Sequence, residues 1–267
     1  MNNNIRIELS FKNISQLDTK LNFCKLNNIK NINIPCKGLI KKDLFNSTIK
    51  YISKNYNEFN VTYHYSLYHQ YSKNQERSYQ VFFDFVKNSN INRNHEILLV
   101  SGSNKKKNFD SVDVLTYLKK EKNLKAKLGI AYNPYFKKYY NIAYERERFE
   151  RKISTGLINS IWFQYGTDIR LLKNEVSYLK KAAKFEKLNL FGSLLIPSKQ
   201  FIARFKFRPW KGVHVSEKLL CSLDDFYYFT RDLVSFYKSH NITPVIETDF
   251  ASSEKLDSVF SFFRNER

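Results

Sequence analysis

Apolar residues recur along this chain with two alternating spacings. In short segments they stand at every second position or form continuous runs, which is typical of half-buried and fully buried β-strands. In the longer segments between them they recur every three to four positions, which is typical of an amphipathic helix. The predicted strands cover residues 5–11, 32–35, 59–66, 96–100, 128–132, 159–163, 190–196 and 244–247. The predicted helices cover residues 14–26, 39–52, 76–86, 110–119, 145–155, 169–185, 201–207, 223–239 and 253–263.

Strand and helix segments alternate about eight times, and no stretch rich in Pro, Gly or Ser divides them. Such alternation predicts parallel strands joined by helices, and the eightfold count favours a closed barrel over an open sheet. We therefore expect residues 1–267 to form one α/β domain, a (β/α)8 TIM barrel. An open doubly wound sheet is the alternative. No G-x-G-x-x-G, Walker A or H-E-x-x-H motif supports another cofactor-binding fold.

In a barrel of this kind, ligand-binding groups stand at the carboxyl ends of the strands. The predicted strand ends carry Glu8, residues 64–66, 101–103 and 132–134, Gln164, Pro197 and Glu247. Gln164 stands out because the apolar strand 159–163 places a polar amide at its end, just before a loop with Gly166 and Asp168. The same glutamine could instead cap the following helix or meet solvent.

The charge balance changes this picture little. Lys and Arg exceed Asp and Glu by 20, a surplus that normally suggests nucleic acid or an anionic surface. The lysines are spread along the whole chain among abundant Asn, Ile, Tyr and Phe, a combination that AT-rich coding sequence also produces. The densest runs, 105–107 and 137–138, are short, and no zinc finger, RNP-type motif or helix-turn-helix pattern occurs. Nucleic acid is therefore not the expected partner.

Composition points to a packed cytoplasmic protein. Hydrophobic residues make up 42% of the chain and aromatic residues 16%, which is ample for a core. No apolar run approaches the roughly 18 residues of a membrane helix, and Arg6 and Glu8 interrupt the first apolar run, so we expect neither a membrane span nor a secretory signal. The three cysteines, Cys24, Cys36 and Cys221, lack metal-ligand spacing, and we expect reduced thiols and no metal site.

Several strand ends, taken in order, resemble the catalytic barrel of methylenetetrahydrofolate reductases. That family's first strand ends with a glutamate, and IRIEL at residues 5–9 puts Glu8 at the matching place. LLVSGS at residues 98–103 keeps the glycine of that family's fourth strand end. GIAYNP at 129–134 is similar to the ending of the fifth strand. FERKISTG followed by IWFQYGTD, at 149–156 and 161–168, is similar to the longest family motif. Further matches are Val112 to Leu115, Gly192, Pro197, Phe201 and Val213 to Ser216. The resemblance covers most of the chain at low identity.

This resemblance implies a flavoprotein of one-carbon metabolism and methionine biosynthesis. FAD would take a hydride from NADH or NADPH and pass it to 5,10-methylenetetrahydrofolate, giving 5-methyltetrahydrofolate. By position in the motifs, Glu8 would be the general acid, and Gln164 and Phe201 would contact the folate. The residues that would contact FAD are His64, Gly102, Ser103, Tyr132, Asn133, Arg151 and Lys152.

Two positions depart from the family pattern. Residues 9–12, Leu-Ser-Phe-Lys, replace a Phe-Phe-Pro-Pro motif, and Ser103 replaces an aspartate near the flavin, so a negative charge is lost there. Two alternative functions therefore stay open. One is a flavin-free, folate-dependent transfer of a methyl or other one-carbon group, and the other is a basic barrel that binds nucleic acid. The sequence leaves open whether the chain forms a homo-oligomer.

Overall fold

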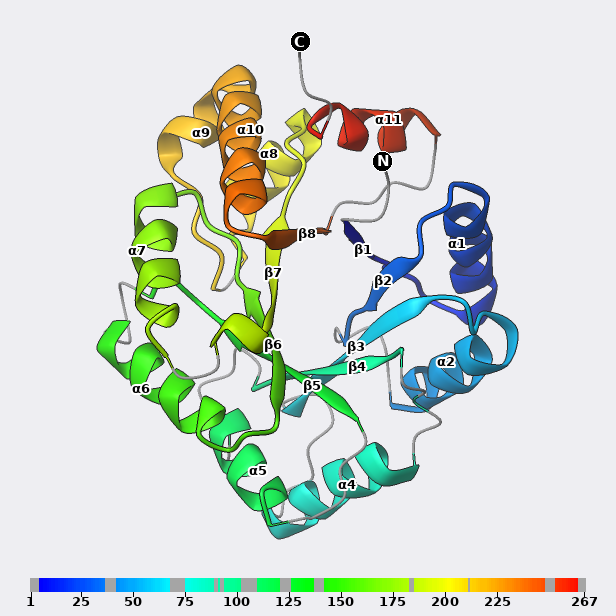
Figure 1. The fold of residues 1–267 in the computed structure, drawn as a ribbon. Coiled ribbons are helices and arrows are strands. Elements are labelled where there is room, and N and C mark those ends of the chain that lie inside the picture. Colours follow the sequence, from blue (N-terminus) through cyan, green and yellow to red (C-terminus); the bar gives the residue numbers. More distant parts are fainter. Residues whose placement is uncertain are drawn as a thin grey trace.

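Eight parallel strands close into a barrel with helices around the outside (Figure 1). The computed structural model describes residues 5–36, 42–67, 75–88, 91, 94–101, 110–120, 126–136, 142–182, 185–210, 212–247 and 253–263. The strands are β1 (Arg6–Glu8), β2 (Asn31–Ile34), β3 (Asn60–Ser66), β4 (Glu96–Val100), β5 (Lys127–Tyr132), β6 (Ile158–Phe163), β7 (Asn189–Leu194) and β8 (Ile242–Ile246).

The helices follow the strands in the expected alternation. They are α1 (Ile14–Leu26), α2 (Lys42–Asn55), α4 (Gln75–Asn88), α5 (Ser111–Leu118), α6 (Ile142–Ile153), α7 (Ile169–Leu179), α8 (Lys199–Phe207), α9 (Glu217–Cys221), α10 (Leu223–Ser239) and α11 (Ser253–Ser261), with a 3-10 turn, η1 (Phe185–Lys187), before β7. Among the described helices, none is both long and apolar enough to cross a membrane.

Every strand pairs in parallel with the next strand of the sequence, and β1 closes the ring on β8 through the pairs Arg6 with Val245 and Ile7 with Ile246. This confirms the predicted (β/α)8 barrel and excludes the open sheet. Closure brings the carboxyl ends of all eight strands to one rim, which we call the mouth of the barrel.

The first strand, predicted over residues 5–11, is shorter because the chain leaves the sheet after Glu8 and turns toward the start of α1, which lies where it was predicted. Asn13 accepts a hydrogen bond from the Gln16 amide and caps α1. After Glu8 the chain makes one more sheet-like bond, from the Leu9 amide to the Asn33 carbonyl, and then turns toward this cap. Glu8 is therefore the last residue of its strand, and its side chain stands at the mouth.

The two faces of the barrel wall differ in chemistry. Outward-facing strand residues such as Ile7, Ile97 and Ile161 are fully buried in the main apolar core between strands and helices. The barrel interior holds a smaller apolar cluster of Leu98, Trp162 and Val245, with Val100 and Phe191 packed against it. Side chains alternate between the two faces along each strand, so neighbouring residues can have opposite environments.

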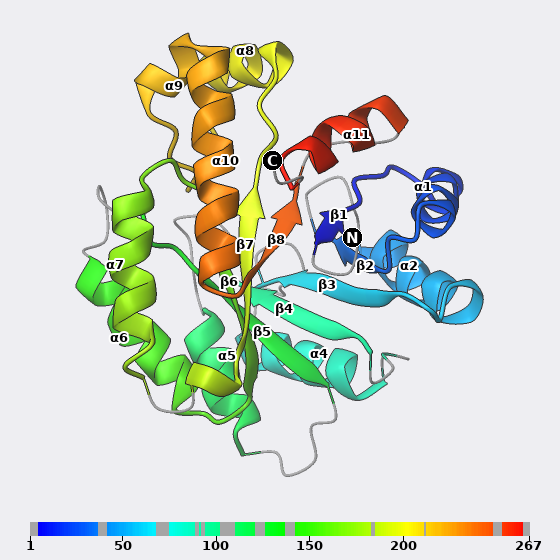
Figure 2. The ribbon, with the colours of Figure 1, turned by 45° about the horizontal axis from the view of Figure 1, so that its top comes forward.

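The residues just before α9 lie beside the loop that follows β6, at one side of the mouth. Figure 2 shows α8 and α9 beyond the end toward which the β7 arrow points, with α10 running back along the barrel. On its return the chain forms a bridge between His214 and Gly166, and the Thr167 amide donates to the His214 carbonyl at 2.9 Å. This pairing holds the segment against the loop that follows β6.

Gly192 on β7 allows α10 to approach the barrel closely. A Cβ atom at this position would lie 2.3 Å from Cζ of Tyr237, whose ring is 1% exposed. The Tyr237 hydroxyl donates to the Ser193 carbonyl at 2.8 Å, so the ring is fixed at both ends. The missing side chain at Gly192 thus determines where this end of β7 meets α10.

We predict that Gly192→Ala lowers the free energy of unfolding by about 1–3 kcal/mol, because the added methyl overpacks a buried ring that cannot move away. Urea denaturation measures the loss. In a second variant that also carries Tyr237→Leu, the combined loss should be smaller than the sum of the two single losses, since the clash is then removed. A neutral Gly192→Ala, or strictly additive losses, would contradict this account.

Candidate functional site

The mouth contains a carboxylate and a histidine that face each other. Glu8 ends β1, and His64 lies on β3 near its carboxyl end. Their nearest atoms, Oε2 of Glu8 and Nδ1 of His64, are 3.9 Å apart, and the side chains are 4% and 18% exposed. The structure thus brings together two residues that the sequence placed at separate strand ends.

A buried arginine lies below this pair, at the start of β1. Nε of Arg6 donates to Oδ1 of Asn33 at 2.9 Å. Nη2 donates to the carbonyls of Ile32 and Asn60 and to Oγ1 of Thr62, at 2.8–3.0 Å. Burial lowers the pKa of the Arg6 guanidinium to about 10, against the opposing effect of the Glu96 charge, so Arg6 stays protonated at neutral pH.

Glu96, the first residue of β4, supplies the opposing charge inside the barrel. Its carboxylate accepts from Oγ of Ser160 at 2.6 Å, and Nε1 of Trp162 donates to the same Oγ at 2.7 Å. Burial raises the pKa of Glu96, while the Ser160 hydrogen bond and the charges of Arg6 and Lys127 oppose this rise. We call Arg6, Asn33, Thr62, Glu96 and Ser160 the polar floor. Sequence analysis gave none of these five a role.

A second carboxylate lies on the neighbouring strand end. Glu247 directly follows β8, and the pairing of Ile7 with Ile246 brings it next to Glu8 in the ring of strands. Oγ of Ser193 donates to Oε1 of Glu247, and Tyr237 holds the Ser193 carbonyl. The resemblance gave Glu247 no role, although its strand-end position is visible in the sequence. Glu8 and Glu247 are therefore two carboxylates on adjoining strands of the mouth.

Two amide side chains line the opposite side of the mouth, beside the segment before α9. Gln164 follows β6 and is half-buried, and its Oε1 accepts from the Tyr165 amide at 3.0 Å. Nδ2 of Asn133, just after β5, donates to the Gly212 carbonyl at 3.2 Å. A Cβ atom at Gly212 would lie 3.8 Å from Nε2 of Gln164. The structure therefore places the predicted residues Gln164 and Asn133 near one another.

Phe201 lies on α8 and is half-buried. Its ring centroid is 5.6 Å from that of Trp210 and 5.8 Å from those of Phe205 and Phe226. Trp210 is 43% exposed. Phe201 is thus part of an aromatic cluster at the mouth end of the molecule, and this packing is sufficient to explain its position.

Three residues predicted to contact a cofactor are not presented to the mouth. The Tyr132 side chain leaves the outer face of β5 and donates to Oε2 of Glu175 on α7 at 2.5 Å. Lys152 is 4% exposed, and its Nζ lies 3.4 Å from the Ala131 carbonyl. Arg151 is exposed on α6. Gly102 and Ser103 lie outside the described residues.

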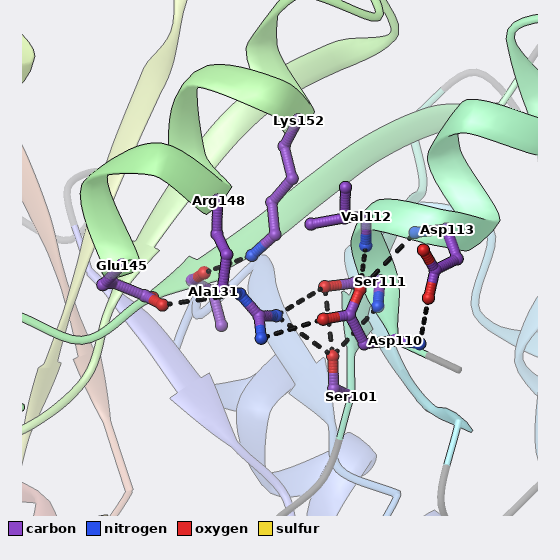
Figure 3. Close-up of polar contacts among 9 residues, drawn as sticks. All are labelled: Ser101, Asp110, Ser111, Val112, Asp113, Ala131, Glu145, Arg148 and Lys152. Carbon is purple, nitrogen blue, oxygen red and sulfur yellow. Dashed lines mark hydrogen bonds and ion pairs between the residues drawn. The ribbon is translucent and has the colours of Figure 1, made fainter. Parts of the chain in front are cut away.

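A further polar group joins the start of α5 to α6 beside the end of β4 (Figure 3). Asp110 caps α5 in a capping box with Asp113, and its Oδ2 lies 2.9 Å from Nη1 of Arg148. The Ser111 amide donates to Oγ of Ser101 at 3.0 Å. These contacts hold residues 101 and 110 together. Because Asp110 already satisfies the α5 amides, this helix start does not offer them to an anion.

No protein-family model matches the chain, and no curated protein matches its sequence. Solved structures do match in fold. A protein from Clostridium thermocellum that binds two copies of 5-methyl-5,6,7,8-tetrahydrofolic acid is 12% identical, with a TM-score of 0.63 over 98% of this chain and 94% of that one. The catalytic domain of a chitinase from Pyrococcus furiosus is 11% identical, with a TM-score of 0.53 over 94% and 85%.

At such low identity these likenesses show the fold alone. Together with the geometry above, they define the class of protein: a (β/α)8 barrel with a charged polar floor and two carboxylates on adjoining strands at its mouth. Among the described residues, no group of three or more His, Cys, Asp or Glu is placed to hold a metal ion.

We predict that Tyr132 stabilises the folded protein, because its hydroxyl donates a hydrogen bond to the buried Glu175 carboxylate. Hydrogen bonds to charged groups contribute about 1.5–3 kcal/mol, so Tyr132→Phe should lower the free energy of unfolding by that amount in urea denaturation. The matched control is Tyr228→Phe on α10, whose side chain is 66% exposed and should change stability by less than about 0.5 kcal/mol. Equal effects of the two substitutions would show that the Glu175 contact is unimportant.

Proposed function

We propose that this barrel binds a reduced folate at its mouth, with Glu8 as the proton donor of a one-carbon reaction. The observation that carries the proposal is the Glu8 carboxyl group, which is almost fully buried at the end of β1 and faces His64 across 3.9 Å. The fold likeness to a barrel that binds 5-methyl-5,6,7,8-tetrahydrofolic acid over nearly the whole of both chains supports the same ligand class.

The side chains at the mouth suit a pterin. A pterin ring has an amide-like edge with donors and acceptors side by side, and an amide side chain can satisfy both. Gln164 and Asn133 supply two such amides on the side opposite Glu8. The aromatic cluster around Phe201 and Trp210 offers flat apolar surface for a ring or its benzoyl extension.

The chemistry assigned to Glu8 is the delivery of one proton. Opening the five-membered ring of 5,10-methylenetetrahydrofolate requires protonation of a ring nitrogen. Protonated Glu8 would release its proton to that nitrogen lone pair, and the negative charge would stay on the carboxylate. A general acid of this kind must stand within hydrogen-bond reach of the atom that it protonates. A strand-end position inside the mouth meets this requirement.

The finer activity suggested by the resemblance is reduction of the methylene group by FAD and NADH or NADPH. When bound, FAD would supply the hydride. Of the five described residues predicted to hold it, the structure brings His64 and Asn133 to the mouth, whereas Tyr132, Lys152 and Arg151 do not lie there. The loss of a negative charge at Ser103 keeps the alternative of flavin-free one-carbon transfer open, and titration with FAD separates the two.

The first test of the proposal is ligand binding. We expect calorimetric titration to show binding of 5-methyltetrahydrofolate, and Gln164→Ala to weaken it about tenfold through loss of roughly 1–2 kcal/mol of hydrogen bonding. Gln80→Ala, on the exposed face of α4, is the matched control and should leave affinity unchanged. A parallel titration with FAD is followed by visible absorption. A shifted flavin spectrum that bleaches on adding NADH or NADPH would support flavin-dependent reduction over flavin-free transfer. Binding of RNA or DNA without any folate binding would overturn the proposal.

The second test concerns Glu8. Glu8→Gln removes the acidic proton and keeps the shape, so it should retain folate affinity while turnover falls by about 10²–10⁴-fold. Turnover is measured as NAD(P)H oxidation with FAD and 5,10-methylenetetrahydrofolate. Glu186→Gln in η1, which is exposed, should keep full activity. Unchanged turnover in Glu8→Gln would show that Glu8 is not the proton donor.

A further inference from the structure

Asn33 connects the polar floor to the mouth. It lies on β2, is fully buried, and stands between Arg6 and His64. Its Oδ1 is 2.9 Å from Nε of Arg6, and its Nδ2 is 3.2 Å from Nε2 of His64. His64 in turn directs Nδ1 toward Oε2 of Glu8. Four residues on three adjacent strands thus form a polar chain of two hydrogen bonds and one 3.9 Å charge–ring approach.

Arg6 sets the direction of both hydrogen bonds in this chain, the one from Arg6 to Asn33 and the one between Asn33 and His64. A guanidinium only donates, so the atom of Asn33 that faces Arg6 must be the carbonyl oxygen. The Asn33 amide group therefore points its NH₂ at His64, and an NH₂ only donates as well. Nε2 of His64 must then be the acceptor. In a neutral imidazole whose Nε2 accepts, the proton is on Nδ1, the atom that faces Glu8.

Arg6 is held in this orientation by several other contacts. Its second nitrogen is bound by two backbone carbonyls and Thr62, and its guanidinium lies 5.7 Å from the Trp162 ring centroid and 5.3 Å from that of Phe191. Glu96 contributes the negative charge nearby. Rotation of Arg6 would break these contacts together, so Asn33 cannot flip without a large cost.

We propose that Arg6 and Asn33 are positioning residues that fix His64 as its Nδ1–H tautomer, with that N–H directed at Glu8. This inference deepens the proposed function, because it explains how Glu8 could give up a proton. When the Glu8 O–H bond breaks and the electron pair stays on the carboxylate, the Nδ1–H of His64 faces the new negative charge. A donor aimed at the charged form favours that form.

Nitrogen NMR of the histidine rings tests the tautomer directly, without any folate. In protein labelled with ¹⁵N-histidine at neutral pH, His64 should show a protonated Nδ1 and an unprotonated Nε2, with assignment by the signals lost in His64→Gln. A protonated Nε2, or a mixture of tautomers, would overturn the inference. His95 and His240, elsewhere in the fold, give reference signals in the same spectrum.

Asn33→Asp provides the matched perturbation. A carboxylate at position 33 accepts from Arg6 and from His64, so the ring must present a protonated Nε2, and the shift of the proton from Nδ1 to Nε2 is the expected result. Asn31→Asp, on the same strand and bonded to Asn60, should leave the His64 signals unchanged. An unchanged His64 ring in Asn33→Asp would also overturn the inference. If that variant fails to fold, the wild-type tautomer decides alone.

The two proposals can fail separately. If His64 shows the expected tautomer but the protein does not bind folate, the positioning role of Arg6 and Asn33 stands and the proposed function is wrong. If the protein binds folate but His64 shows the opposite tautomer, the proposed function stands and the positioning role of Arg6 and Asn33 is wrong.

Discussion

The guanidinium of Arg6 is the group around which the barrel interior is arranged. A buried charge is tolerated only when its donors are satisfied and a counter-charge is near, because desolvation alone costs several kcal/mol. Five strands supply what Arg6 needs: β2 and β3 give carbonyls, an amide and a hydroxyl, β4 gives Glu96, and β6 and β7 give the rings of Trp162 and Phe191. Removing one partner of such a group typically costs 3–5 kcal/mol, so these positions are coupled to one another.

This arrangement connects stability with the mouth. A barrel interior filled by branched apolar residues would give rigid packing and no direction to the groups above it. Here the apolar cluster of Leu98, Trp162 and Val245 fills only part of the interior, and the polar floor beside it ends at Asn33. Because hydrogen bonds are directional, the orientation that Arg6 imposes on the Asn33 amide also decides which ring nitrogen of His64 accepts a hydrogen bond. The same contacts that satisfy Arg6 therefore set the geometry at Glu8.

The sequence predicted the barrel well because the fold depends on periodicity, and periodicity is local. Eight apolar strand segments separated by amphipathic helices leave few other topologies. It also predicted Glu8, Gln164 and Asn133 as mouth residues, since each stands at or just past a strand end. Tyr132 was predicted less well from its strand-end position. It too ends a strand, but the alternation of side chains along the strand turns it outward. Its hydrogen bond to Glu175 on α7 joins residues far apart in the sequence, so only the closed barrel shows it.

The remaining part of the site depends on contacts between residues far apart in the sequence. In the sequence, Arg6 is simply a polar residue in an alternating strand. The neighbouring sequence does not indicate that Thr62, Glu96 and Ser160 lie around it. The segment from Gly212 to Ser216 has no periodic pattern, so its place beside Gln164 follows only from its pairing with the loop after β6.

Fold alone also decides little about chemistry, since barrels as different as a tetrahydrofolate-binding protein and a chitinase domain share this architecture. What distinguishes one barrel from another is the set of strand-end groups and how firmly they are oriented. In this chain the orientation originates with one arginine and passes through one amide to a histidine that faces a carboxylate. A ligand at the mouth would therefore meet groups whose donor and acceptor roles are already fixed before it binds, and pre-organisation of that kind is what makes a proton transfer efficient.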